Sequence, residues 1–274
     1  MAGIDVVIPA GGKITDEFAR VAGVSSKALI KYEDVSVLKR TIQALRGSRN
    51  VGRIVIVGNA DVLAAEEADL VDAALPAGNS SVDNIKIALD HLANLDFPPD
   101  RVLVVTADLP FLTTATVDEF LGLCIGYVDL YVPIINKNDW DEKFPGADAS
   151  FVRLLDGEWT TGCVYIISTR GFKIAQPFIE KVFQLRKSKS KMAMMLGWKF
   201  LWDYMNKKLT VTDIEKKIEE LVKINGMAVP GAPAEVAYDI DYLDDYHYTL
   251  SVFRARAAKE AAEREAAEKA TANQ

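Results

Sequence analysis

The sequence predicts an α/β protein with three layers, in which a mostly parallel, twisted sheet lies between helices. Three short apolar runs rich in β-branched residues, at 4–8, 53–58 and 101–106, are typical of buried strands. Between the first two runs, apolar residues at helical spacing predict an amphipathic helix over residues 36–46: Val35, Leu38, Ile42 and Leu45. A strand, a helix and a strand in that order imply a right-handed crossover between parallel strands.

Further elements follow along the chain. Ser80 precedes apolar residues at helical spacing, so we expect a helix with Ser80 at its N-cap. A helix near residues 117–123 leads to a strand at 128–135, and Asp156-Gly157 predicts the turn of a hairpin. Strand-like runs are expected at 161–167 and 237–241, helices at 214–221 and 243–253, and irregular loops at 14–26 and 139–146.

Composition limits the class of protein. Half of the 274 residues are hydrophobic, enough for a large core, and we expect one domain over residues 1–256 followed by a charged tail at 257–274, a frayed or solvated helix extension. The formal charge of -7 argues against a nucleic-acid binder. Cys124 and Cys163 have neither disulfide-framework nor zinc spacing. No secretory leader and no apolar run long enough for a bilayer is present, so the expected location is the cytoplasm.

The first strand ends in Pro9-Ala10 and runs directly into Gly11-Gly12-Lys13. Because glycine lacks a Cβ, its backbone N–H groups can approach a ligand closely, which suits phosphates. Neither of the two best-known phosphate-loop motifs is present here, so a purely structural turn is an equal alternative. After the turn, a polar stretch delivers Lys27 to an apolar pair.

One acidic residue follows a predicted strand, and two others lie within a second one. Asp108 comes just after the strand at 101–106, at the edge where open α/β sheets bind ligands, and is the best candidate for a metal ligand. The alternative is an aspartate that only bonds to its own turn before Pro110. Asp239 and Asp241 point to the same side of an extended chain, where paired carboxylates suit a hard divalent cation.

Three other segments each allow two interpretations. The Gly78 to Ser81 segment is either a helix cap, which spacing favours, or a place where free N–H groups meet a base or phosphate. Gly162 either lets the backbone approach a sugar or marks a β-bulge. The basic run Arg186, Lys187, Lys189 and Lys191 is either a solvated loop or a clamp for an anionic substrate. The apolar residues after it are expected in the core rather than on a membrane face: Met192, Met195, Leu196, Phe200, Trp202 and Met205.

Four short motifs in order resemble the MobA-like NTP transferases, a branch of the nucleotidyltransferases with a glycosyltransferase-A type fold. They are residues 9–12 (PAGG), 26–29 (SKAL), 106–110 (TADLP) and 239–241 (DID), and the resemblance spans roughly residues 4–246. It implies a Rossmann-like nucleotide-diphospho-sugar transferase fold. It also implies roles for individual residues: Ala10, Gly11 and Gly12 hold phosphates, Lys27 neutralises them, Asp108, Asp239 and Asp241 bind Mg²⁺, Gly78, Ser81 and Asn84 recognise the base, Gly162 lines the sugar, and Arg186 and Lys187 contact the acceptor.

The chain departs from the family pattern in three places. In the family, the two glycines are followed by a further glycine or serine and then by an arginine. Here Lys13 follows the glycines, and Lys13 or Arg20 would replace that arginine. Ser26 stands where proline is expected before the lysine. Cys163 stands where related sequences often carry asparagine.

The leading hypothesis from the sequence is therefore an enzyme, a nucleotidyltransferase. It would transfer a nucleoside monophosphate from an NTP, with CTP or GTP expected, to a phosphorylated small molecule, using Mg²⁺ and releasing pyrophosphate. One alternative is a glycosyltransferase of the same type of fold that consumes a nucleotide sugar. The other is a non-catalytic nucleotide-binding subunit. The oligomeric state is left open, with a homo-oligomer as one alternative, and neither a nucleic-acid partner nor a membrane span is expected.

Overall fold

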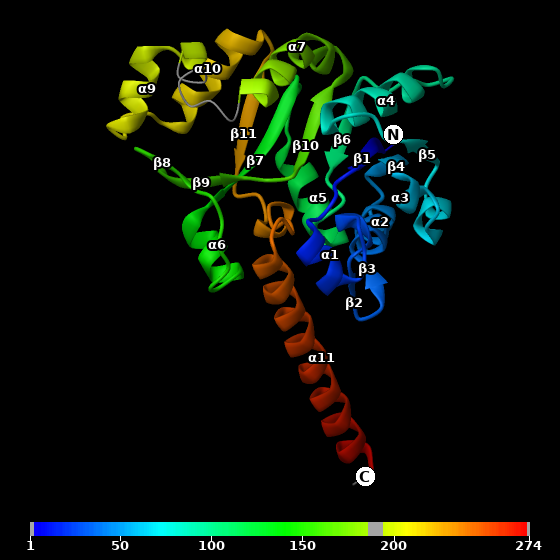
Figure 1. Ribbon diagram of the computed structural model, residues 1–274. Coiled ribbons are helices and arrows are strands. Elements are labelled where there is room, and N and C mark those ends of the chain that lie inside the picture. The colour runs from blue at the N-terminus through cyan, green and yellow to red at the C-terminus, as the bar shows by residue number, and fades with distance from the viewer. Residues whose placement is uncertain (1–2, 186–193, 273–274) are drawn as a thin grey trace.

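The computed structural model describes residues 3–185 and 194–272, and it centres on a nine-stranded sheet between helices (Figure 1). The strands lie in the order β5-β4-β1-β6-β10-β7-β9-β8, and β11 pairs with β7. Within these residues β9 and β10 run against the other seven strands, so the predicted mostly parallel sheet is confirmed. The strands are β1 (Ile4–Ala10), β4 (Val51–Gly58), β5 (Ala73–Pro76), β6 (Arg101–Val105), β7 (Leu130–Asn136), β8 (Val152–Leu154), β9 (Gly157–Thr161), β10 (Val164–Ser168) and β11 (Gly226–Pro230).

Helices cover both faces of the sheet, which gives the three predicted layers. Along β1, Val6 and Ile8 belong to one core with helices α2 (Val37–Gly47) and α5 (Thr114–Leu123). Val7 belongs to a second core with α4 (Ser81–Ala93) and α7 (Thr169–Leu185). Successive side chains of a strand point to opposite faces, so a sheet buried on both faces needs apolar residues in unbroken runs.

Short elements complete the chain. The remaining helices are α1 (Asp16–Ala22), α3 (Ala60–Leu63), α6 (Lys137–Lys143), α9 (Trp198–Met205), α10 (Val211–Val222) and α11 (Leu243–Ala272). Single turns of 3-10 helix lie at Lys27–Leu29, Glu66–Leu70 and Ala234–Val236, and strands β2 (Lys31–Tyr32) and β3 (Val35–Ser36) form a small hairpin. Among the described helices, none combines the length and the apolar character that crossing a bilayer requires.

Two predicted helix starts are confirmed by their caps. The Ser36 hydroxyl accepts the backbone N–H of Lys39 at 3.0 Å at the start of α2. The Ser80 hydroxyl accepts that of Asp83 at 3.1 Å at the start of α4. Each cap satisfies a backbone donor that a helix leaves free in its first turn.

Two stretches that we expected to be irregular loops contain helices. Residues 14–26 contain α1, which buries Phe18 against Tyr246 with ring centroids 5.7 Å apart. Residues 139–146 overlap α6, whose Trp140 stacks on Tyr238 at 5.7 Å. Both predictions were wrong because each seven-residue helix buries a single aromatic residue, too little for a helical period to show in the sequence.

Three further expectations need correction. The run 237–241 is not a strand, because the chain there follows a 3-10 turn and leads into α11 without pairing. The strand expected over 161–167 begins only at Val164, since β9 ends at Thr161 and the two residues between them turn the chain. Trp202 and Met205, expected in the core, are exposed, while Met192 lies outside the described residues. The tail beyond residue 256 continues α11 and projects from the body (Figure 1).

Candidate active site

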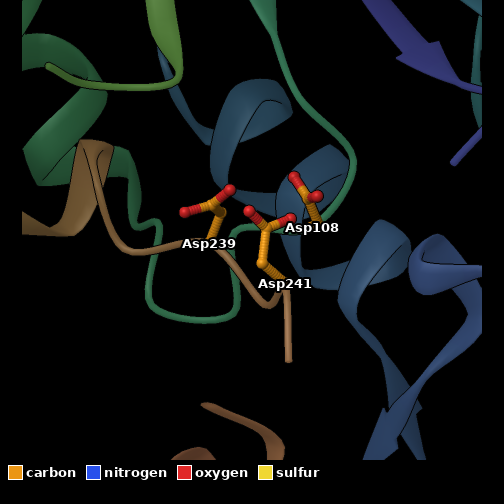
Figure 2. Close-up of side chains that lie close together, drawn as sticks. All are labelled: Asp108, Asp239 and Asp241. Carbon is orange, nitrogen blue, oxygen red and sulfur yellow. The ribbon is translucent and has the colours of Figure 1, made fainter. Parts of the chain in front are cut away.

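Three carboxylates from distant parts of the chain meet at one edge of the sheet (Figure 2). Asp108 lies just after β6, and Asp239 and Asp241 lie just before α11. One carboxylate oxygen from each lies within 4.8 Å of the others. The Ile240 N–H donates to the backbone carbonyl of Asp108 at 3.2 Å, which fixes the two segments against each other. The sequence therefore located this cluster although it assigned the second segment to the wrong element.

A turn between β9 and β10 holds the two segments in place. The Cys163 N–H donates to the Val236 carbonyl at 2.8 Å, and the Cys163 carbonyl accepts the Thr106 N–H at 3.2 Å. A Cβ on Gly162 would lie 2.6 Å from the ring of Pro133 and 3.0 Å from the Val236 carbonyl oxygen. Gly162 is thus needed for close packing of the protein on itself, and this side of the residue is covered.

Lys27 supplies a positive charge to the cluster. Its ammonium lies 3.6 Å from Asp108 and donates a hydrogen bond to Asp241. Burial alone would lower the pKa of Lys27, but the attraction of Asp108, Asp241 and Asp239 outweighs burial and raises it. Lys27 therefore stays charged at neutral pH.

Three carboxylates lie around the single Lys27 ammonium, and the pKa values of two of them are raised. Burial, together with the negative charges of Asp108 and Asp241, raises the pKa of Asp239 to about 7. Burial also raises the pKa of Asp108, against the opposing effect of Lys27. A further cation nearby would stabilise the ionised form of these carboxylates.

Oxygen atoms at the cluster are available to a cation. Within the described part of the chain, Asp108 Oδ1 is buried and makes no hydrogen bond of standard geometry. A buried oxygen without a partner is costly, and a bound ion would satisfy it. Carboxylate oxygens are the donors that Mg²⁺ takes. Asp108, Asp239 and Asp241 therefore fit a divalent cation.

The glycine turn after β1 packs against the segment that carries Lys27. The Gly12 carbonyl accepts the Lys27 N–H at 3.2 Å, and Lys13 forms an antiparallel bridge with Ser26. Gly12 and Lys13 are exposed, whereas Ala10 at the end of β1 is buried. The turn thus positions Lys27 while its own backbone stays open to a ligand.

Asn84 on α4 explains why residue 11 is a glycine. A Cβ on Gly11 would lie 2.8 Å from Asn84 Nδ2. The Asn84 side chain is buried, and its Oδ1 accepts the Gly78 N–H at 2.8 Å. Asn84 therefore joins the glycine turn to the Gly78 segment, while Gly78 and Ser81 are themselves exposed. Arg186 and Lys187 lie outside the described residues.

Asn59 and Asp245 at the site were not predicted from the sequence, and Cys163 was predicted only as a departure from the family pattern. Asn59 donates from Nδ2 to the Gly11 carbonyl at 3.0 Å. The Asp245 carboxylate accepts the N–H groups of Asp241 at 2.9 Å and Tyr242 at 2.7 Å. Burial raises the pKa of the Cys163 thiol well above its usual range, and the charges of Asp239 and Asp108 add to the shift. Only Asp245 had a signal in the sequence, as an acidic residue in the first turn of a helix.

The sequence model of the MobA-like NTP transferase domain matches residues 6–204, so the chain belongs to that family of nucleotidyltransferases, and its sheet has the Rossmann-like α/β form of the fold. A hypothetical transferase from Thermus thermophilus has 27% identity and a TM-score of 0.77, covering 89% of this chain and 99% of its own. Asp108 lies within the matched range, whereas Asp239 and Asp241 lie beyond it.

More distant structures share the fold. The 2-C-methyl-D-erythritol 4-phosphate cytidylyltransferase of Thermus thermophilus has 15% identity and a TM-score of 0.53, covering 92% of this chain and 99% of its own. A nucleotidyl transferase from Methanothermobacter has 14% identity and a TM-score of 0.54, covering 93% and 99%. A search of the curated proteins found no match.

Proposed function

We propose that the chain transfers a nucleoside monophosphate from an NTP to a phosphorylated small molecule, with Mg²⁺ as cofactor and pyrophosphate as the second product. The observation that carries this proposal is the cluster of Asp108, Asp239 and Asp241 around Lys27, next to the exposed glycine turn. Membership of the MobA-like NTP transferase family supports the choice of an NTP as donor.

In the proposed reaction, an oxygen of the acceptor phosphate attacks the α-phosphorus of the NTP. The new phosphorus–oxygen bond forms as the bond to the β-phosphate oxygen breaks, and pyrophosphate leaves with that electron pair. A phosphate is already ionised at neutral pH, so the acceptor needs no general base. Positioning and neutralisation of charge are therefore the main tasks of the protein.

The residues divide these tasks. Backbone N–H groups of Gly11 and Gly12 bind phosphate oxygens, and Lys27 neutralises their charge with help from the exposed Lys13. Asp108, Asp239 and Asp241 would hold Mg²⁺, which supplies charge neutralisation at phosphate oxygens when bound.

The other ligand contacts extend the proposal. Gly78 and Ser81, with Asn84 behind them, contact the base, Gly162 lies along the sugar, and Arg186 and Lys187 serve the acceptor phosphate. One of the structures with the same fold is a cytidylyltransferase, so CTP is the first donor to test and GTP the second.

A screen of pyrophosphate release tests the proposal. It crosses the four NTPs with sugar, polyol and alcohol phosphates in the presence of Mg²⁺, and at least one combination should release pyrophosphate. Release of a nucleoside diphosphate from a nucleotide sugar would instead show a glycosyltransferase. Nucleotide binding without turnover on any acceptor would show a non-catalytic subunit.

Asp108→Asn tests the assignment of the acid cluster. The substitution keeps the shape of the side chain and removes its charge, so we expect Mg²⁺-dependent pyrophosphate release to fall about 100-fold or more. Asp244→Asn is the matched control, because Asp244 is an exposed aspartate of the nearby first turn of α11. Equal activity of the Asp108→Asn variant and the wild type would refute the assignment.

A further inference from the structure

Helix α9 carries a row of exposed apolar side chains. Trp198, Trp202 and Met205 are 78%, 60% and 69% exposed, and their spacing of four and three residues places them on one side of the helix. Met194 is 84% exposed as well, but Gly197, whose φ is 92°, separates it from α9. We call Trp198, Trp202 and Met205 the α9 face. Within the described chain, α9 has no buried residue, so the helix rests on the body only through half-buried side chains.

Lysines lie on α9 and directly after it, next to the α9 face in the sequence. The Lys199 side chain is 94% exposed although it pairs with Asp203 at 3.3 Å, and Lys207 and Lys208 are exposed just after the helix. The eight residues before Met194 lie outside the described part of the chain, and their sequence contains four further Lys or Arg residues. Residues 186–208 thus hold seven cationic residues and one acidic residue, a net charge of +6 in a chain of net charge -7.

We propose that the α9 face docks on an anionic lipid surface. Helices that lie in a membrane interface bury aromatic and aliphatic side chains at the level of the headgroups and surround them with Lys and Arg. Tryptophan in particular prefers this layer, because its ring is apolar and its N–H is polar. The concentration of cations in this one segment of an acidic chain fits attraction to anionic headgroups.

The shape of the α9 face favours lipid over a protein partner. A stable protein interface buries about 800 Å² on each side. A single row of three side chains on one short helix is a narrow ridge, which is small for such an interface. A ridge is sufficient for insertion among lipid headgroups, where the surrounding lipids adapt to the side chains.

Vesicle flotation with the full-length protein tests the proposal without depending on its enzymatic activity. We expect binding to vesicles of phosphatidylglycerol and phosphatidylcholine, weaker binding when salt is raised, and little binding to phosphatidylcholine alone. Trp198→Ala combined with Trp202→Ala should weaken binding at least tenfold. Lys207→Glu combined with Lys208→Glu should weaken binding to the anionic vesicles.

Phe97→Ala is the matched control. Phe97 is an aromatic residue that is 84% exposed, and it lies between α4 and β6, away from α9 in the sequence. Its replacement should leave vesicle binding unchanged, and every variant should keep the thermal midpoint of the wild type. Absence of wild-type binding to anionic vesicles, or equal binding by the double tryptophan variant, overturns the proposal. Self-association that the tryptophan substitutions abolish, without vesicle binding, would identify a second copy as the occupant and also overturns it.

Discussion

Asp239 shows the charge imbalance of the site in its raised pKa. Its pKa of about 7 arises from burial and from the neighbouring charges of Asp108 and Asp241. In the unfolded chain the same group titrates near its ordinary value of 3.8. Between these two values the folded protein binds more protons than the unfolded protein, so the free energy of unfolding of the metal-free protein falls as pH rises.

Asp239→Asn should therefore stabilise the metal-free protein. At pH 8 the wild type carries the full penalty of the ionised group, and because the site is partly open to water we expect a gain on the order of 1 kcal/mol from its removal. The gain should shrink when the pH is lowered to 5, where the folded wild type is largely protonated at this position. Urea unfolding in a chelator at both pH values measures the effect. Asp244→Asn should show no such gain, and a variant no more stable than wild type at pH 8 would contradict the prediction.

Some residues of the site could be predicted from the sequence because general rules place them. Asp108 follows a buried strand, and the carboxyl ends of parallel strands meet at the ligand-binding edge of a sheet. Asn59 could not be found in this way. Its side chain donates to the backbone carbonyl of Gly11, which is 48 residues away in the sequence. A contact with a backbone atom leaves no pattern of residue types that a motif could record.

At the scale of elements, the turn after β1 and helix α4 are fitted to each other through one glycine. In a Gly11→Ala variant the new methyl group would displace the buried Asn84 amide and weaken its bond to Gly78. We expect a loss of about 1–3 kcal/mol in the free energy of unfolding, as for other substitutions that overfill a packed site. In Gly12→Ala the nearest atom would lie 3.7 Å away, an ordinary contact with the Lys27 side chain, so this control should stay within about 0.5 kcal/mol of wild type. Urea unfolding measures both, and equal stabilities would show that Asn84 does not select glycine.

Long elements with a regular apolar period were predictable, and short ones were not. Helices α2 and α4 show several apolar residues on one side together with a serine cap. Helices α1 and α6 each bury one aromatic residue, and that residue packs on a distant part of the chain. Apolar residues recur along α9 at the spacing typical of a core helix, but this spacing shows only which residues share one side of the helix. It does not report whether another element covers that side, which is why Trp202 was wrongly placed in the core.

For the whole molecule, the C-terminal part of the chain completes a site that begins at the N-terminus. The range matched by the family ends at residue 204, before β11 and before two of the three acidic residues. Strand β11 pairs in parallel with β7, and the chain then turns back so that Ile240 bonds to Asp108. The start of α11 must therefore be anchored for the acid cluster to exist.

Phe253 provides that anchor, and two truncations would locate the boundary of the folded unit. The Phe253 ring stacks on Tyr32 at 5.3 Å and on Phe111 at 5.8 Å, and the Arg40 guanidinium lies 4.3 Å from its centroid. Residues 257–264, by contrast, are exposed.

Ending the chain after Arg256 should change the free energy of unfolding by no more than about 0.5 kcal/mol, because it removes no buried side chain among the described residues. Ending it after Val252 should cost about 3–5 kcal/mol, as expected when a buried phenylalanine is lost from a core. Urea unfolding of the two truncated proteins measures the difference. An equally large loss of stability in the protein that ends after Arg256 would place the boundary of the folded unit beyond residue 256. It would show that the projecting part of α11 stabilises the body.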